Sequence, residues 1–455
     1  MSESSPVIFW FRRDLRVTDH PALAAAAERG PVVPVFIFDD TLTAPAGDNR
    51  MAFLIDSLAD LDANSLGGAL VVRSGGPAEV LAAVADETGA TAVYATDDHG
   101  PYGRRRDDRV GEALADRGME VHYLDSNYAI APDTVKTGSG TSYKVFTPFF
   151  RAWSDVGWAE PGGKVDVDWV TGVDSDGLPD APEVEAELPP VGEQAAWDRF
   201  RWFLDDAIAD YDEARDRPAI DGTSRLSPYL KWGVVHPRQL LAELDGRRAG
   251  HQTYRKELAW REFYADVLFA RPETAHHAFN EKMTAMEVDT DAGAKERFET
   301  WCRGETGYPI VDAGMRQLLA EGWMHNRVRM IVASFLVKDL HVDWTWGARH
   351  FMRHLVDGDL ASNQHGWQWV AGTGTDASPY FRIFNPTGQA QKFDPSGDYV
   401  RRYVPELAGL DAKRIHEPWD AGLDRPADYP APMVDHGAER AESLERYDRL
   451  KTTWE

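Results

Sequence analysis

Short apolar runs alternate with helical patterns over the first third of the chain. Five runs rich in β-branched and aromatic residues are predicted to be strands, at 7–11, 32–38, 69–73, 92–95 and 121–124. Segments rich in alanine and leucine lie between them, for example at 22–29 and 51–61. This alternation predicts a doubly wound parallel sheet. No GxGxxG motif follows the first run, so the sequence does not predict a dinucleotide site of the usual type.

The pattern changes twice further along the chain. Between about 158 and 190 the sequence is rich in Gly, Pro and Asp and has no periodicity, which is typical of a connection. Beyond Trp197 the β-branched runs disappear and helical patterns dominate. We therefore expect an α/β domain over 1–130, a long interdomain linker over 131–196 and a helical domain over 197–455.

Length and composition limit the class of protein. A chain of 455 residues exceeds one ordinary hydrophobic core, so more than one domain is expected. No apolar run approaches the length of a membrane span, and the first residues lack the features of a signal peptide. Cys302 is the only cysteine, which excludes an intramolecular disulfide and a thiolate metal cluster. We expect a cytoplasmic protein without a metal.

The charge balance is strongly acidic. There are 75 acidic and 49 basic residues, a formal net charge of −26, and only 11 of the 49 bases are lysine. The acids are dispersed along the chain, which is typical of adaptation to a salt-rich cytoplasm, where screening weakens self-repulsion. Any nucleic-acid site must therefore be a local basic patch.

Residues 357–369 contain the closest grouping of candidate functional side chains. Asp357, Asp359, the amide of Asn363 and the indoles of Trp367 and Trp369 fall within about four helical turns. A large π-system buried there would meet carboxylates, a neutral amide and oxidisable rings, an inventory that suits a flavin. The alternative is a tryptophan-rich helical core.

Residues 221–233 form a second motif. Thr223, Ser224 and Ser227 precede or open a predicted helix, where free backbone N–H groups and hydroxyls can bind a diphosphate. The alternative is an ordinary helix start with Pro228 in the first turn. The pattern is longer than capping requires, which favours the diphosphate.

Two helical stripes complete the set. Glu257 and Trp260 share a helical face, where they offer an acceptor for a base edge and a stacking platform. Glu257 and Arg261 alternatively form a surface ion pair at i,i+4. The second stripe, which is alternatively part of a core, places three side chains on one face: Asn326, Arg329 and Met330.

Together these segments resemble the photolyase/cryptochrome family, specifically its class I cyclobutane pyrimidine dimer (CPD) photolyases. The resemblance runs through residues 7–16 (VIFWFRRDLR), 143–148 (YKVFTP), 307–313 (GYPIVDA) and 393–394 (FD), nearly the whole chain in order. It implies an N-terminal Rossmann-like α/β domain for an antenna chromophore, then a linker. An all-helical C-terminal domain follows and binds a U-shaped FAD.

The resemblance also implies residue roles. Arg329 paired with Asp357 would flank the isoalloxazine, Asp359 would accept its hydrogen bonds, and Asn363 would lie near N5. A neutral amide there suits a reduced, anionic flavin, whereas the Asp of plant cryptochromes suits signalling. The full set implied to bind FAD is Tyr211, Thr223, Ser224, Arg225, Leu226, Ser227, Arg329, Asp357, Gly358, Asp359 and Asn363.

The substrate pocket of the family corresponds to Glu257, Trp260, Asn326 and Met330. Six-four photolyases carry a histidine at the position of Met330, so a cyclobutane dimer is the expected substrate. Photolyases act on a nucleotide flipped out of the duplex, and a dimer stacks and pairs poorly. The residues predicted to contact the DNA, pocket included, are Arg215, Glu257, Trp260, Arg261, Asn326, Arg327, Arg382, Gln389 and Lys392.

The resemblance implies a series of tryptophans that carries electrons to the flavin, and this series is incomplete in this chain. Trp367 and Trp344 match the flavin-proximal and middle positions, but no tryptophan stands at the expected distal position near 284–292. Trp301 or a surface tyrosine is the candidate for the exit.

The antenna residues point to a deazaflavin. Residues 98–107 (DHGPYGRRRD) resemble members that bind an 8-hydroxy-deazaflavin-type chromophore, although Gly100 replaces an expected acid. The alternative is methenyltetrahydrofolate. The residues expected to line the antenna pocket are Arg50, Phe53, Asp98 and Lys231.

The expected activity is light-driven repair of CPDs in DNA by electron transfer from excited, reduced FAD, that is, a deoxyribodipyrimidine photo-lyase. We expect a monomer whose partner is dimer-containing DNA, with neither a membrane nor an obligate protein partner. The alternatives are a cryptochrome-like blue-light receptor, a six-four photolyase, and a flavoprotein that binds single-stranded DNA without repair. Asn363 and the lack of a long extension after the last helical pattern, 438–450, disfavour the receptor.

Overall fold

The computed structural model describes residues 5–422 and 426–454. The chain forms two compact units. The first unit comprises Met1–Val184, Pro189–Trp202 and Ser224–Pro272, and the second comprises Glu185–Leu188, Phe203–Thr223 and Glu273–Glu455.

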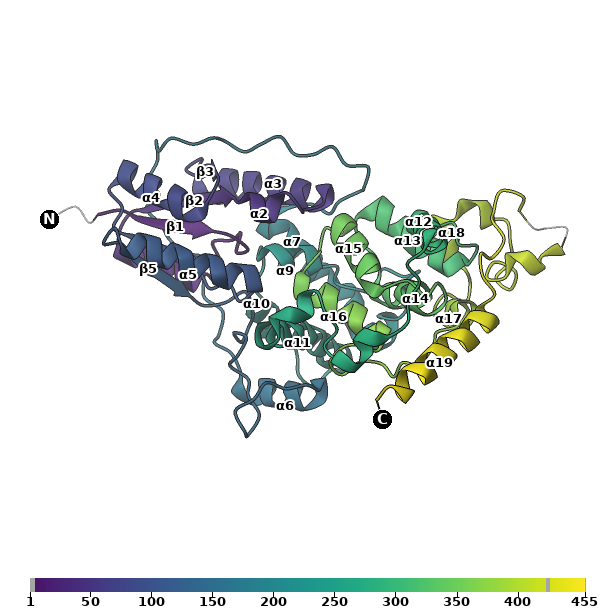
Figure 1. Cartoon of the computed structure of the whole chain (residues 1–455). Coiled ribbons are helices and arrows are strands. Elements are labelled where there is room, and N and C mark those ends of the chain that lie inside the picture. The colour runs from purple at the N-terminus through teal and green to yellow at the C-terminus, as the bar shows by residue number, and fades with distance from the viewer. Residues whose placement is uncertain (1–4, 423–425, 455) are drawn as a thin grey trace. The chain divides into compact units, whose positions relative to one another are not determined.

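The first unit contains the predicted parallel sheet. Within its described residues five strands pair in the order β3-β2-β1-β4-β5, all parallel (Figure 1). They are β1 (Val7–Phe11), β2 (Val32–Phe38), β3 (Val71–Ser74), β4 (Ala92–Thr96) and β5 (Glu120–Leu124). All residues of β1, β2 and β4 are buried, because both faces of a parallel sheet are covered. This burial explains why the strands read as continuous apolar runs rather than alternating ones.

Helices of the first unit flank the sheet and extend beyond it. They are α1 (Pro21–Arg29), α2 (Asp40–Thr43), α3 (Asp48–Leu61), α4 (Pro77–Thr88), α5 (Pro101–Ala115), α6 (Phe146–Val156), α7 (Gly192–Trp202), α9 (Ser227–Trp232), α10 (Pro237–Ala242) and α11 (Ala249–Ala270). The order β3-β2-β1-β4-β5 reverses direction between β1 and β4, the position at which doubly wound sheets bind ligands.

The segment expected to be a linker, 131–196, is partly ordered against the first unit. It contains the whole of α6 and the start of α7. The backbone of Val32 in β2 donates to the carbonyl of Asp168 at 2.8 Å and accepts from the N–H of Val170 at 2.9 Å. The N–H of Asp176 donates to the carbonyl of Val72 in β3 at 2.9 Å. The irregular chain is therefore held by backbone hydrogen bonds that its composition does not reveal.

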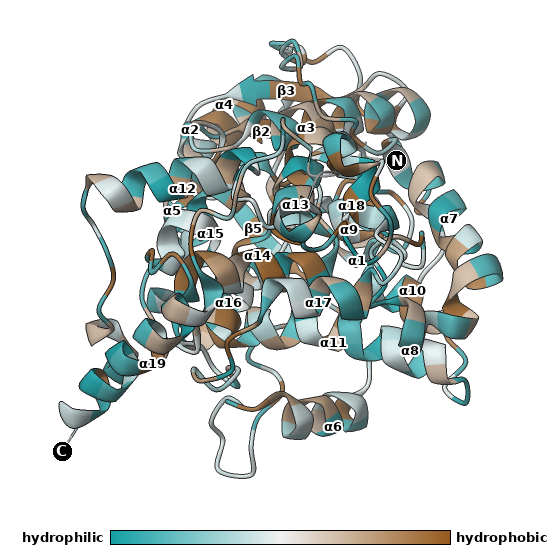
Figure 2. Ribbon diagram, turned by 90° about the vertical axis from the view of Figure 1, so that its right-hand side faces the viewer, coloured by the Kyte–Doolittle hydropathy of each residue, from teal (hydrophilic) through white to brown (hydrophobic). Residues whose placement is uncertain are grey.

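The second unit is helical, as predicted, and forms no β-strand within its described residues. Its α-helices are α8 (Tyr211–Ala214), α12 (Ala292–Arg303), α13 (Pro309–Glu321), α14 (Asn326–Lys338), α15 (Trp344–His354), α16 (Leu360–Ala371), α17 (Pro386–Phe393), α18 (Asp398–Tyr403) and α19 (His436–Thr452). The contrast in colour between α14, which has hydrophobic turns, and the mainly hydrophilic α19 is visible in Figure 2.

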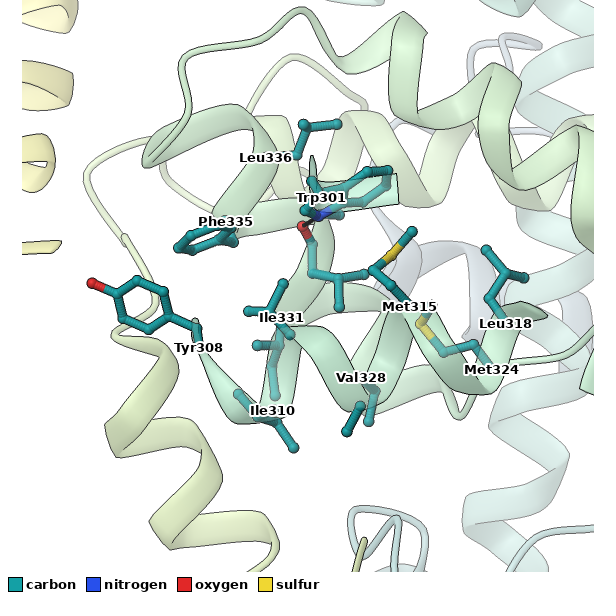
Figure 3. Close-up of a cluster of buried hydrophobic side chains, with 14 of the residues drawn as sticks. Trp301, Tyr308, Ile310, Met315, Leu318, Met324, Val328, Ile331, Phe335 and Leu336 are labelled. Atoms are coloured by element: carbon teal, nitrogen blue, oxygen red, sulfur yellow. Dashed lines mark hydrogen bonds between the residues drawn. The ribbon is translucent and has the colours of Figure 1, made fainter. Parts of the chain in front are cut away.

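One large core holds the second unit together. Trp301, Tyr308, Phe335 and Leu336 are all at most 5% exposed and lie together in Figure 3. Burying an aromatic side chain of this size removes on the order of 200 Å² of surface from water, so these rings dominate the stability of the core. Among the described helices of the whole chain, none is both long and apolar enough to span a bilayer.

Candidate cofactor and nucleic-acid site

The acids and the amide of residues 357–369 lie at the start of α16. Asp359 caps this helix, its carboxylate accepting the N–H of Ser362 at 3.0 Å, and Asn363 lies in the first turn. Asp357, Gly358 and Asp359 are all buried. A helix N-terminus carries unsatisfied N–H groups and a partial positive charge. This end of α16 therefore suits an anionic or electron-rich group.

Arg329 of α14 adds a full positive charge at the same place. Its Nη2 donates to Asp357 Oδ2 at 2.8 Å, and its Nε donates to the carbonyl of Met324 at 2.8 Å. The Arg329 side chain is 25% exposed and that of Asp357 only 4%. The predicted Arg329–Asp357 pair is thus present, and the second hydrogen bond fixes the direction of the guanidinium.

The amide of Asn363 is oriented by its neighbours. Its Nδ2 donates to the carbonyl of Ala348 at 3.1 Å and to Gln364 Oε1 at 2.9 Å. Both amide hydrogens are used, so the group that Asn363 offers to a ligand is its carbonyl oxygen, an acceptor. A reduced flavin carries an N–H at N5, which requires an acceptor of this kind.

The serine-rich motif has an unusual backbone. Arg225 has φ +51°, in the left-handed region that side chains other than glycine rarely adopt. Ser224 is held on both sides: its hydroxyl accepts from Tyr254 Oη at 3.1 Å and its carbonyl accepts from Arg199 Nε at 2.9 Å. Leu226 is buried, and Ser227 opens α9 with Pro228 following, as predicted. These contacts belong to the first unit.

Thr223 and Tyr211 belong to the second unit, whose boundary with the first falls between Thr223 and Ser224. Tyr211 opens α8 and is 7% exposed. Its ring meets that of Phe203 edge-on at 5.3 Å. The residues present therefore fit FAD in kind: a cation, a helix N-terminus and an oriented acceptor for the ring system, and hydroxyls for the phosphates.

Glu257 and Trp260 lie half-buried on α11 in the first unit. The sequence predicted Trp260 as a stacking platform, and the structure shows what supports it. The ring of Phe146, at the start of α6, stacks on Trp260 with centroids 3.7 Å apart and planes 9° apart. In the sequence, Phe146 stands out only as part of the YKVFTP motif, and no spacing rule connects it to Trp260.

A buried acid on α11 was also missed. Both oxygens of Glu262 accept hydrogen bonds: from Trp153 Nε1 at 2.6 Å, from the N–H of Ile130 at 3.2 Å and from the N–H of Ala129. Burial raises the pKa of Glu262 to about 7, against the lowering effect of these donors. Glu262 thereby ties α6 and the 129–130 backbone to the helix that carries Glu257 and Trp260.

Basic residues predicted to contact DNA divide into two groups. Arg327 and Lys392 lie over the ring of Phe393, at 4.5 and 5.0 Å, so the second unit brings these two together. Arg327 Nη2 also donates to Asp216 at 2.7 Å. Arg261, in the first unit, donates to the carbonyls of Asn127 and Leu230, both at 3.0 Å, contacts that give it a structural role.

The residues of the second unit that are predicted to line the dimer pocket or to contact the DNA are at least partly exposed. Asn326, Arg382 and Lys392 are exposed, and Arg215, Gln389 and Met330 are half-buried. The backbone carbonyl of Arg382 accepts from Lys338 Nζ at 3.0 Å. Burial lowers the pKa of Lys338 to about 7, so this buried lysine holds the Arg382 backbone at a cost in solvation.

The predicted electron-transfer tryptophans all lie in the core of the second unit. Trp301, Trp344 and Trp367 are 0%, 7% and 3% exposed. The rings of Trp301 and Trp367 meet edge-on at 6.2 Å.

The predicted antenna residues all lie in the first unit. Arg50 and Phe53 are buried on α3, and Phe53 meets Tyr229 of α9 edge-on at 5.8 Å. Asp98 follows β4 and accepts from Arg106 Nη2 at 3.2 Å. Burial opposes ionisation of Asp98, but Arg106, Arg12 and Arg13 outweigh it and hold its pKa well below the usual range. Lys231 lies 4.8 Å over the ring of Trp232.

Two family models match the chain. One, described as the FAD binding domain of DNA photolyase, covers residues 254–449, and the other, described as DNA photolyase, covers 7–163.

Full-length relatives agree. A deoxyribodipyrimidine photo-lyase of Streptomyces griseus is 44% identical and aligns over 98% of this chain and 99% of its own. A crystal structure of a bacterial class III photolyase from Agrobacterium tumefaciens superposes with a TM-score of 0.89 at 39% identity, covering 99% of each chain. A Synechocystis cryptochrome superposes equally well, at 0.89, but with 27% identity over 97% of this chain and 99% of its own.

The predicted family is confirmed by these matches, whereas the narrower assignment to class I stays a prediction, because the class III enzyme is also similar. The α/β fold with its sheet, the helical unit and the full-length relatives agree on one assignment: the chain belongs to the DNA photolyase family.

Proposed function

We propose that the protein is a deoxyribodipyrimidine photo-lyase that repairs cyclobutane pyrimidine dimers in DNA under light. The observation that carries the proposal is the full-length similarity to a protein of that name at 44% identity. The oriented groups at the start of α16 support it, because they suit a reduced flavin.

FAD, when bound and reduced, supplies an electron donor that light can excite. Arg329, Asp357, Asp359 and Asn363 would hold its ring system. The carbonyl oxygen of Asn363 would accept a hydrogen bond from the N–H at N5, and Arg329 would favour negative charge on the ring. Tyr211 and the segment Thr223, Ser224, Arg225, Leu226 and Ser227 would hold the phosphates and the ribityl chain. Asp357 and Asp359 are buried, so these surroundings would limit the access of water to the ring.

The substrate residues have separate tasks. Trp260 stacks on the flipped-out dimer, and Glu257 hydrogen-bonds it where negative charge develops as it takes up an electron. Asn326 adds a hydrogen-bonding amide, and Met330 fills the place at which a six-four photolyase has a histidine. The residues Arg215, Arg261, Arg327, Arg382, Gln389 and Lys392 are proposed to contact the DNA backbone or add positive charge.

One experiment tests the function. Chemically reduced holoenzyme is mixed with an oligonucleotide containing one thymine dimer, and restored thymines are counted after illumination and after the same time in darkness. We expect thymines to be restored in the illuminated sample and not in the dark sample. Glu257→Ala should lower the repair yield per photon several-fold and leave FAD bound, since Glu257 acts on the dimer. An equal yield would mean that Glu257 only supports the helix.

A cryptochrome-like receptor is the second candidate, because a cryptochrome shares the fold at 27% identity. A receptor of this kind is expected to absorb light without repairing the dimer in the same assay. Parallel reactions use DNA that contains a six-four photoproduct. Repair of this lesion instead of the thymine dimer would identify a six-four photolyase. Tight binding of damaged single strands without repair in any reaction would identify a DNA-binding flavoprotein.

For the antenna we propose a deazaflavin-type chromophore, with methenyltetrahydrofolate as the alternative. Asp98 supports this proposal because its carboxylate is held ionised and fixed by Arg106 at the switch point of the sheet. Arg50, Phe53 and Lys231 would contribute the other walls. An absorption spectrum of the extracted chromophores decides, since a folate band in the near ultraviolet without a deazaflavin band would reject the proposal.

A further inference from the structure

The core of the second unit carries aromatic contacts beyond the three predicted tryptophans. Trp301 is fully buried, so a reductant in solution cannot touch it. Its ring lies 6.2 Å from Trp367 and 5.8 Å from Phe298. Phe298 in turn meets Trp346 of α15 edge-on, with centroids 5.3 Å apart. Trp346 is half-buried and therefore reaches solvent.

We propose that Trp346 is the exit of the tryptophan chain that reduces the flavin, reached from Trp367 through Trp301 and across Phe298. Phenylalanine is too hard to oxidise to hold the charge itself. Its ring instead fills the gap between two indoles, and tunnelling through packed atoms is far faster than tunnelling across empty space or water. The inference rests on the proposed function, because it requires that the protein binds FAD.

Electrostatics favour movement of the positive charge outward. Trp301 Nε1 donates to the carbonyl of Val332 at 3.1 Å, whereas the buried Nε1 of Trp367 has no hydrogen-bond partner among the described residues. An oxidised indole is cationic, and an acceptor on its N–H stabilises that cation, as in other charge-assisted hydrogen bonds. The charge is therefore more stable on Trp301 than on Trp367, and water stabilises it further on Trp346.

A neutral neighbour keeps this gradient intact. The ring of His350 lies 5.6 Å from that of Trp301. Burial, then His354 and Arg353, lower the pKa of His350 to about 3, so it adds no positive charge beside the oxidised indole.

Gly347 fixes the geometry at the inner end. A Cβ at this position of α15 would lie 2.1 Å from the Trp367 ring and 2.7 Å from Leu336. The indole of Trp367 therefore packs directly on the backbone of the helix that carries Trp344 and Trp346. Trp344, the predicted middle residue, makes no ring contact with another aromatic side chain among the described residues, which favours the route through Trp301.

Electrons balance along this route. With FAD bound, Trp367 would give one electron to the excited, oxidised flavin for each photon, Trp301 would give one to Trp367, and Trp346 would give one to Trp301. A thiol in solution then gives one electron to Trp346 and loses its proton to water. The net change is one electron moved from the thiol to the flavin.

The test compares three conservative variants of the holoenzyme with oxidised FAD: Trp346→Phe, Trp344→Phe and Trp419→Phe. Trp419 is the matched control, a half-buried tryptophan on the same core whose ring contacts Tyr308. Flash absorption without thiol is expected to show a long-lived tryptophan radical in the parent and in Trp419→Phe. In Trp346→Phe this radical should be lost, because the charge stays buried and returns to the flavin.

A second readout does not depend on flavin turnover. After prolonged illumination in air, peptide mapping by mass spectrometry should locate oxidised indole at residue 346 and not at 419. Loss of the long-lived radical in Trp344→Phe with full retention in Trp346→Phe would overturn the proposal, as would an unoxidised Trp346.

Failure of the proposed repair function gives a different pattern. Dithionite-reduced Trp346→Phe should repair dimers as well as the parent, because repair itself needs no exit tryptophan. If the reduced parent repairs nothing while Trp346 still forms the radical, the function is wrong and the exit stands. Equal FAD content and circular dichroism in all variants establish that they fold.

Discussion

Arg329 is the residue on which flavin binding should depend most directly. Its hydrogen bond to the nearly buried Asp357 joins two charged groups at 2.8 Å. A hydrogen bond from this charged, oriented guanidinium to the flavin would contribute about 1.5–3 kcal/mol to binding. We expect Arg329→Ala to weaken FAD binding roughly 10- to 100-fold. Titration of apoprotein with FAD, followed by flavin fluorescence, measures the change. The exposed Arg349 on α15 supplies the control, and Arg349→Ala should bind FAD normally. Equal affinities for the two variants would remove Arg329 from the site.

Phe146 is expected to matter through Trp260. Its ring covers one face of the indole at 3.7 Å, and aromatic pairs contribute about 0.5–1.5 kcal/mol beyond the area they bury. Phe146→Ala and Phe146→Leu should therefore weaken binding of a dimer-containing oligonucleotide about five-fold, by an estimated 1 kcal/mol. Val145→Ala, a change at an exposed neighbour, should leave it unchanged. Fluorescence anisotropy measures all three. A loss that is equal for undamaged DNA would indicate a general effect on folding instead.

The sequence could predict Arg329 and Asp357 but not Phe146 or Trp346. The first two belong to motifs long enough to be matched to a family. Phe146 and Trp260 are 114 positions apart, and Trp346 meets Trp301 only through Phe298, so these contacts exist only after the helices pack. No periodicity in a single sequence encodes them.

At the scale of elements, α11 joins the substrate residues to a buried acid. Burial raises the pKa of Glu262 in the folded state to about 7, above its ordinary value of 4.5. Between these two values the folded protein binds more protons than the unfolded chain, so stability falls as pH rises from about 4.5 to 7 and is level above that range. A pKa difference of one corresponds to about 1.4 kcal/mol, so the free energy of unfolding should fall by on the order of 3 kcal/mol over this pH range.

Glu262→Gln removes this titration. The free energy of unfolding in urea, measured for parent and variant at pH 5 and pH 8, should show a parent that loses stability relative to the variant as pH rises. A difference between parent and variant that is independent of pH would mean that Glu262 keeps an ordinary pKa in the fold. Glu257→Gln is a suitable control, because this half-buried residue lies on the same helix.

The sequence predicts some secondary-structure elements more accurately than others, for a physical reason. The inner strands β1, β2 and β4 follow from apolar runs because the parallel sheet buries both of their faces, and β1 and β2 match their predicted bounds residue for residue. Within the expected linker 131–196, only 158–190 has the composition of a connection, and α6 forms before that stretch, at Phe146–Val156. Trp153 of α6 donates a hydrogen bond to Glu262, which lies 109 positions away along the chain.

At the scale of the whole molecule, a net charge of −26 must coexist with binding of a polyanion. Four cations that are predicted to contact DNA belong to the second unit: Arg215, Arg327, Arg382 and Lys392. Each phosphate neutralised on duplex DNA contributes about −0.9 to the slope of log affinity against log salt concentration. Four such contacts give a slope of about −3.6, which is modest and leaves much of the affinity to stacking and hydrogen bonding in the dimer pocket.

The four cations should not contribute equally. Lys392 is exposed, so Lys392→Ala should reduce the slope by nearly 1. Arg327 is already paired with Asp216 at 2.7 Å and must exchange that carboxylate for a phosphate. Arg327→Ala should therefore change the slope less than Lys392→Ala, and Asp216→Asn should strengthen DNA binding at low salt. Anisotropy titrations with dimer-containing duplex at several salt concentrations measure these slopes. If Asp216→Asn weakens binding, the pair instead positions Arg327 for DNA, and the acidic partner is part of the site rather than a competitor for it.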